Sequence, residues 1–283
     1  MRIRPFAMLC LAGALALSAC KKPADGEVSK GLDPVNVIDE SNLNDIMLTV
    51  ADPEEGVAYF RRALREKPDR IDLKRGLGIS LLRAHRADEA AVVLSEVAQS
   101  PEATEEDRVN LADALIRTGK WDEAEKVLDS IRPTYETYRR YRLEAMVADH
   151  KHEWKKADAF YETAAGLTTQ PAPVYNNWGY SKLIRGDAAA AEKLFLQALT
   201  YDENLFTAKN NLVLARARQG KYSLPLVKMT QIEKAQLLYT AGLAAAKQGE
   251  TDIARQLLQE AIDTHPRYFA EAVRSLRALE AQG

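Results

Sequence analysis

Cysteine is nearly absent from this chain of 283 residues, which has only Cys10 and Cys20. The rest of the sequence therefore cannot form a disulfide, a thiolate metal site or a cysteine nucleophile. An excess of charge of one sign is also absent, because 39 Lys and Arg residues stand against 41 Asp and Glu residues. A nucleic-acid binder needs a strongly basic domain or face, so this balance argues against nucleic acid as a partner.

One long apolar run is present, over residues 6–17, directly after the basic Arg2 and Arg4. At about a dozen residues it is too short to cross a bilayer as a helix, and it predicts an export signal peptide over residues 1–19. The segment that follows, Leu17-Ser18-Ala19-Cys20, resembles the lipobox of bacterial lipoproteins, in which the cysteine is acylated and becomes the mature N-terminus. An ordinary secretory signal also ends in small residues and is the alternative.

The lipobox resemblance implies that Cys20 carries a lipid such as palmitate. Lys21 follows it in place of the aspartate that is typical of inner-membrane retention, so we expect a lipid anchor in the outer membrane, facing the periplasm. Pro23, Gly26 and Pro34 then indicate a flexible tether over residues 20–36.

A repeat of about 34 residues organises the remaining chain. A small residue recurs at Gly56, Ala90, Ala124, Ala157, Ala191 and Ala254. The period, with two amphipathic helices per unit and a glycine at the turn, resembles the tetratricopeptide repeat. Trp121, Gly179 and Pro266 stand at positions where that repeat carries tryptophan, glycine and proline. The resemblance implies an all-α helical solenoid of about six to seven helix-turn-helix units.

The array is expected over residues 37–219, followed by an irregular connection over residues 220–231. Pro225 interrupts the pattern there, because proline in a helix interior removes a hydrogen bond and clashes with the preceding turn. Residues 232–283 are expected to form a last repeat and a C-terminal capping helix. Two start signals mark helices inside these limits: Asp52-Pro53-Glu54-Glu55, and the capping box of Thr230 with Glu233.

Catalytic and metal motifs are not found in the sequence. His150 and His152 are two residues apart, a spacing that does not place two side chains on one helix face. No phosphate-binding glycine loop and no serine nucleophile elbow occurs. We therefore predict a protein that is not an enzyme and needs no cofactor. Trp121, Trp154 and Trp178 are interpreted as core packing.

The first helix of each unit is expected to line a concave groove with its second, fifth, sixth, ninth and thirteenth positions. These positions predict a peptide-binding groove, because asparagine can pair with a peptide backbone and arginine with a carboxylate. The candidate residues are Asn110, Arg139, Arg142, Asn176, Asn177, Asn210 and Asn211. Arg75, Arg83, Arg117 and Arg218 are read at the same positions. The alternative is that these side chains only bind water or a neighbouring helix.

Three stretches carry a further resemblance: residues 176–187, residues 207–212, and the irregular segment from Leu224 to Gln231. Repeat residues explain part of it, and only the signal and the irregular segment are more particular. Together with the lipobox the three stretches resemble the tetratricopeptide-repeat lipoprotein of tight-adherence (Flp) pilus assembly. The resemblance implies a scaffold that assists assembly or targeting of the pilus secretion machinery, with an outer-membrane secretin or another pilus component as its protein partner. Two alternatives remain: a scaffold of another outer-membrane or cell-wall complex, and a regulatory subunit of a periplasmic hydrolase.

Overall fold

The computed structural model describes residues 43–281. Cys20, the signal peptide, the tether and the start of the expected array lie outside these residues. Within this range all regular secondary structure is helical. The helices after a short helical stretch at residues 43–49 are α2 (Pro53–Glu66), α3 (Ile71–Arg83), α4 (Ala87–Gln99), α5 (Glu105–Arg117), α6 (Trp121–Asp129), α7 (Tyr138–His150), α8 (Trp154–Gly166), α9 (Ala172–Ile184), α10 (Ala188–Tyr201), α11 (Phe206–Ala217), α12 (Gln231–Lys247), α13 (Thr251–Thr264) and α14 (Ala270–Glu280).

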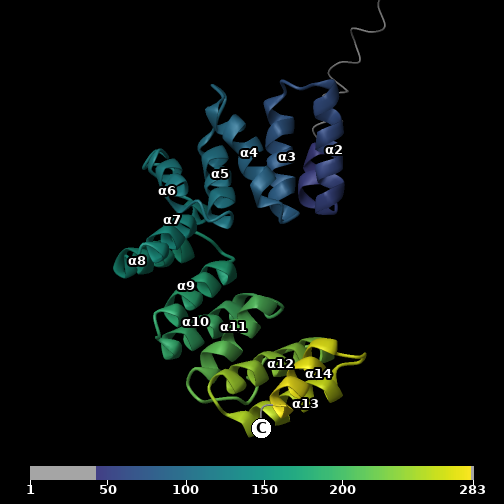
Figure 1. Cartoon of the computed structure of the whole chain (residues 1–283). Helices are drawn as coiled ribbons and strands as arrows, with labels where there is room; N and C mark the ends of the chain where they lie inside the picture. The colour runs from purple at the N-terminus through teal and green to yellow at the C-terminus, as the bar shows by residue number, and fades with distance from the viewer. Residues whose placement is uncertain (1–42, 282–283) are drawn as a thin grey trace, which may run out of the picture.

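The helices stack in antiparallel pairs, and the stack curves into an arc with α2 at one end and α14 at the other (Figure 1). The first helices of successive pairs (α3, α5, α7, α9 and α11) contact one another, whereas in the described part of the chain the second helices (α4, α6, α8 and α10) do not. The first helices therefore lie on the inner, concave side of the arc. The expectation of an all-α helical solenoid with a C-terminal capping helix is confirmed. No helix in residues 43–281 is long and apolar enough to cross a membrane.

The expected helix starts are found in the structure. The Asp52 carboxylate accepts a hydrogen bond from the Glu54 backbone N–H at 2.9 Å, and Pro53 opens α2. Thr230 and Glu233 form a reciprocal capping box at the start of α12. Each device satisfies backbone N–H groups that have no partner inside the helix.

The first helices end in a shared turn in which one residue adopts a left-handed backbone. Glycine takes this position after four of them, at Gly119, Gly186, Gly220 and Gly249. Histidine takes it after α3 and α7, with φ of 59° at His85 and 60° at His152. In both kinds of turn the next backbone N–H donates back to a carbonyl five residues earlier, as Arg86 does to Leu81. A side chain with a Cβ is strained in this conformation by about 1 kcal/mol or more.

Replacing His85 with glycine is therefore expected to raise the free energy of unfolding by up to about 1 kcal/mol. The His85 side chain is exposed and accounts for no hydrogen bond in the described structure, so little is lost with it. Urea unfolding measures the change. His85→Ala, which keeps the Cβ, is the matched control and should give no gain; a glycine variant less stable than wild type would contradict this account of the turn.

Each helix pair is closed by a small residue and a large residue one turn apart on the second helix. The alanines predicted from the repeat are fully buried, and each has a large side chain four residues later that is at most 2% exposed. These pairs are Ala90 with Leu94, Ala124 with Leu128, Ala157 with Tyr161, Ala191 with Phe195, and Ala254 with Leu258. The small residue permits close approach of the helices, and the large one fills the space between pairs.

The pair that begins with α11 has no second helix. Residues 218–230 connect α11 to α12 without helix, and α11 packs directly on α12. The ammonium of Lys209, only 1% exposed, reaches the Glu233 carboxylate at 2.9 Å across this junction. The described residues thus contain six helix pairs, counting residues 43–49 with α2, and one unit that is incomplete.

Candidate functional site: a concave groove

The concave face carries a groove whose walls come from the ninth and thirteenth residues of the first helices. On α7 these residues are Met146 and His150, and on α9 they are Tyr180 and Ile184. Tyr180 and Ile184 are 51% and 53% exposed, although both are large and apolar. Exposed apolar side chains gathered on one face are typical of a surface that binds another protein.

The first hollow in this groove lies between α7 and α9 and has a volume of about 360 Å³. We call it the α7–α9 hollow. Its wall is mostly apolar and aromatic, and the Trp121 ring is stacked on the His150 ring at a centroid distance of 4.5 Å. The lining residues are Trp121, Met146, Asp149, His150, His152, Tyr161, Asn176, Asn177, Tyr180, Ile184 and Asn211.

A second hollow of about 500 Å³ continues the groove over α9, α11 and α12. Tyr180 and Ile184 line both hollows and form the ridge between them. Leu214 and Leu243 supply apolar wall, and Arg218 and Lys247 add positive charge. The groove is therefore continuous across at least three repeats, which suits an extended segment of a partner better than a small molecule.

Asp149 is the acidic group in the wall of the α7–α9 hollow. It is 9% exposed, and it accepts hydrogen bonds from the Tyr161 hydroxyl at 2.9 Å and the Ser181 hydroxyl at 2.5 Å. Burial raises the pKa of Asp149, which these two hydrogen bonds oppose. Both bonds join α7 to neighbouring helices and fix the shape of the hollow.

Three of the predicted asparagines come together in this hollow. The Asn211 amide donates to the Asn176 side-chain oxygen at 3.1 Å, and the Asn177 amide lies 3.4 Å from the Met146 sulfur. All three are partly exposed. They retain hydrogen-bonding capacity toward a bound chain, because each amide carries two donors and an acceptor.

Asn110 and Asn210 are arranged differently. Asn110 is 3% exposed, and its oxygen accepts a hydrogen bond from Arg139 of the next repeat at 2.7 Å, so it does not reach the groove surface. Arg139 is also paired with Glu106. Asn210 accepts a hydrogen bond from the Thr240 hydroxyl at 2.8 Å. Asn110, Arg139 and Asn210 thus join neighbouring repeats, which is the alternative role that the sequence left open.

Other arginines read as groove residues also hold repeats together. Arg75 contacts both Asp107 carboxylate oxygens at 2.9 Å, and Arg83 donates to the backbone carbonyls of Met47, Leu48 and Ala51. Arg142 differs from them: among the described residues its guanidinium has no hydrogen bond or ion pair, and its Nε is buried. Burial lowers the pKa of Arg142.

Sequence reasoning missed Met146, Tyr180 and Ile184, and it assigned Trp121 to packing alone. Trp121 does pack against the core, but it also lines the hollow. The signal was present, because these three residues stand at the ninth and thirteenth helix positions that the repeat pattern directs inward.

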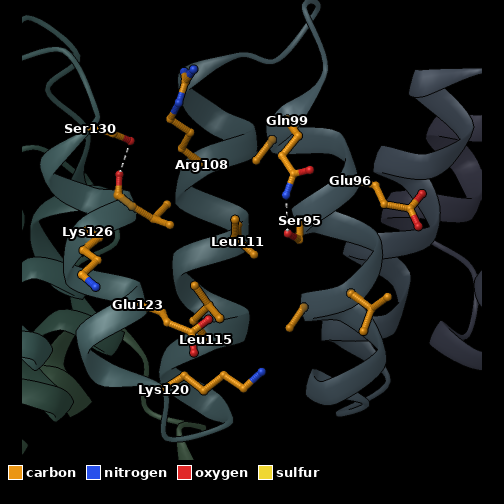
Figure 2. A pocket seen from close by; sticks show the side chains of 14 residues that line it. Ser95, Glu96, Gln99, Arg108, Leu111, Leu115, Lys120, Glu123, Lys126 and Ser130 are labelled. Carbon is orange, nitrogen blue, oxygen red and sulfur yellow. Dashed lines mark hydrogen bonds between the residues drawn. The ribbon is translucent and has the colours of Figure 1, made fainter.

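The convex side has a larger hollow, of about 720 Å³, between α4 and α6 (Figure 2). Leu111 and Leu115 of α5 form its floor, and Glu96, Glu123 and Lys126 stand around it (Figure 2). It exists because the second helices separate on the outer side of the arc, and a smaller hollow recurs between α6 and α8. The hollow is therefore a consequence of curvature. Among residues 43–281, no cluster of three or more His, Cys, Asp or Glu side chains could hold a metal ion.

Comparison with known families supports the repeat pattern. Three family models described as tetratricopeptide repeat match residues 48–104, 81–147 and 236–268. Residues 148–235, which include most of the groove, match none of these models. No curated protein sequence matches the chain.

Solved structures share the fold at low sequence identity. Human IFIT1, solved as a dimer with m7Gppp-AAAA, is 16% identical with a TM-score of 0.62, over 90% of this chain and 69% of that one. A tetratricopeptide repeat protein from Parabacteroides merdae is 13% identical with a TM-score of 0.54, over 89% and 97% of the two chains. A chain of the APC/C hetero-tetramer Cut9-Hcn1 is 15% identical with a TM-score of 0.58 over 81% of this chain, which spans 46% of that relative's length. These likenesses support the solenoid fold.

Proposed function

Because this chain is a tetratricopeptide-repeat protein, we propose that it is a periplasm-facing outer-membrane lipoprotein that binds a partner protein in its concave groove. The proposal includes a role in assembly or targeting of the tight-adherence (Flp) pilus secretion machinery. The partner is then an outer-membrane secretin or another pilus assembly component. The protein works as a scaffold, without cofactor or catalytic step.

The observation that carries the binding role is the continuous groove with exposed Tyr180 and Ile184 on its central ridge. Tetratricopeptide repeats are scaffolds for protein–protein interaction, and the groove provides the apolar contact area that such an interface needs. Asn176, Asn177 and Asn211 supply amide groups beside the apolar wall. An extended peptide backbone can pair with these amides while its side chains enter the hollows.

The membrane location rests on Leu17-Ser18-Ala19-Cys20, whose residues lie outside the described structure. We expect Cys20→Ser to leave an unprocessed or soluble precursor, since the thiol that accepts the lipid is lost. Labelling with a radioactive fatty acid, followed by membrane fractionation, measures this. The wild-type chain should take up label and sediment with the outer membrane. Absence of label in wild type would rule out the lipoprotein part of the proposal.

The partner is tested by affinity capture from detergent-solubilised outer membrane and mass spectrometry. A pilus secretin or another pilus assembly protein is the expected capture. Recovery of a cell-wall hydrolase or of another outer-membrane complex would replace the pilus role by one of the two alternatives. The double variant Tyr180→Ala and Ile184→Ala truncates the ridge without altering the buried core. It should therefore lose the capture if the groove binds the partner.

A further inference from the structure

Arg142 lies on the concave face of α7, one helical turn before Met146 of the α7–α9 hollow. Its charge acts on the Tyr161 hydroxyl, which lines that hollow. The Arg142 side chain is partly exposed, and its Nε is buried without a hydrogen-bond partner. A buried N–H without a partner is costly, and proteins normally pair it. Its unpaired state in the free protein therefore points to a ligand that pairs it.

Arg142 is the guanidinium of its cluster that has no carboxylate partner among the described residues. Two neighbouring guanidiniums already have carboxylate partners, Arg117 with Asp113 and Arg139 with Glu106. Arg142 itself adds a third positive charge to this cluster. An acidic group of a ligand can therefore pair with Arg142 without displacing an existing partner.

The adjoining hollow selects a different kind of group. Its volume of about 360 Å³ and its apolar wall fit one large side chain. A carboxylate entering the hollow would approach Asp149, which is acidic and already bonded to Tyr161 and Ser181. The acidic and the apolar group of the ligand must therefore occupy separate subsites, with the carboxylate at Arg142.

The distance between the subsites sets the spacing in the ligand. One turn of α7, from Arg142 to Met146, spans about 6 Å. In an extended peptide, residues two apart lie on the same side at a separation of about 6.6 Å. We propose that Arg142 and the α7–α9 hollow together bind an extended segment of the partner in which an acidic residue stands two positions from an aromatic or large aliphatic residue. The inference rests on the proposed use of the concave groove and specifies what enters it.

The test uses the full chain purified in detergent and labelled heptapeptides with amidated C-termini, followed by fluorescence anisotropy. The probes carry the core Glu-Ser-Phe, Gln-Ser-Phe or Glu-Ser-Ala. Wild type should bind the Glu-Ser-Phe peptide about tenfold or more tightly than either other peptide, since one comparison removes the charge and the other the apolar anchor. Amidation removes the terminal carboxylate, so binding cannot come from the chain end.

Arg142→Gln should abolish the preference for the Glu peptide over the Gln peptide and keep the preference for Phe over Ala. Arg142→Lys should keep part of the preference for Glu over Gln. Tyr180→Ala with Ile184→Ala should lose the Phe preference. Arg277→Gln, an exposed arginine on α14, is the matched control and should change neither. Thermal unfolding provides a second readout. Arg142→Gln should be at least as stable as wild type, because a partly buried charge without a partner is removed, whereas loss of a structural arginine would lower stability.

Equal affinity for the Glu and Gln peptides in wild type, or a preference that survives in Arg142→Gln, would overturn the inference. The same holds if no peptide binds while affinity capture of the partner persists in Arg142→Gln; the proposed function then stands without this subsite. If the Tyr180→Ala, Ile184→Ala variant loses capture while Arg142→Gln keeps it in full, the inference about Arg142 is likewise wrong and the proposed function stands. If none of these variants changes the capture of the partner, the concave groove is not the binding site.

Discussion

Replacing Glu233 with glutamine is expected to lower the free energy of unfolding by about 2 to 3 kcal/mol, because it leaves the buried Lys209 ammonium without its counter-ion. Lys209 is 1% exposed, and Glu233 is its ion-pair partner at 2.9 Å. Glutamine can still serve the capping box with Thr230, so the change isolates the charge. The effect should be large because this pair joins α11 to α12 where the second helix of the unit is missing.

Lys209→Met is the matched control, since it removes the buried charge and keeps the length of the side chain. Its loss of stability should be clearly smaller, and the double variant should be more stable than Glu233→Gln alone. Urea unfolding of the four proteins completes the cycle. A double variant that shows the simple sum of the two losses would contradict the pairing.

The same pair has a pH signature. The pKa of Glu233 is lower than its ordinary value of 4.5, first because the Thr230 backbone N–H donates to the carboxylate; burial opposes this and Lys209 adds to it. A lowered native pKa gives a contribution that is present above the unfolded-state value and is lost as the pH falls through the native one. Wild type should therefore lose more stability than Glu233→Gln between neutral pH and pH values below 4.5.

Gly76→Ala is expected to cost about 2 to 3 kcal/mol, because a Cβ at this position would lie 2.3 Å from a ring carbon of Phe60. Phe60 belongs to α2 and is fully buried in the core against Gly76 of α3, so its ring can give way only by disturbing that core. Gly166→Ala is the matched control: it also lies in a helix, a Cβ there meets nothing within 4 Å, and its stability should be unchanged or slightly higher.

Thermal unfolding compares the two glycine variants. A shorter side chain at position 60 should recover part of the loss, so Phe60→Leu in the Gly76→Ala background should be less harmful than in wild type. Equal midpoints for Gly76→Ala and Gly166→Ala would show that the packing of α2 against α3 is looser than described.

The fold was predictable because local signals and the repeat period agree. The cap at Asp52, the capping box at Thr230 and the small residues at 34-residue spacing each correspond to a feature of the structure. His85 and His152 could not be read as helix ends, because histidine seldom adopts the left-handed backbone that glycine takes in the other turns. The turn is imposed there by the packed helices on either side.

The groove was only partly predictable, because helix position tells which way a side chain points and not what the neighbouring repeat places against it. Asn110 has the same position in its helix as Asn177 and Asn211, yet Arg139 of the next repeat covers it. Arg83 points to the backbone carbonyls of residues 47–51, a contact across more than thirty residues that no local pattern reveals. Met146, Tyr180 and Ile184 were not predicted, because an apolar residue in a helical repeat usually indicates core packing.

We propose that the concave groove, and not the convex surface, holds the partner protein. Site-specific photo-crosslinking in living cells distinguishes the two faces, with benzoylphenylalanine at Tyr180 on the concave ridge or at Val92 beside the convex hollow. Both positions are exposed, at 51% and 65%, so either probe is accessible. We expect a crosslinked partner from position 180, lost when Arg142 is also replaced by glutamine, and none from position 92. A partner crosslinked from position 92 and not from position 180 would contradict the account.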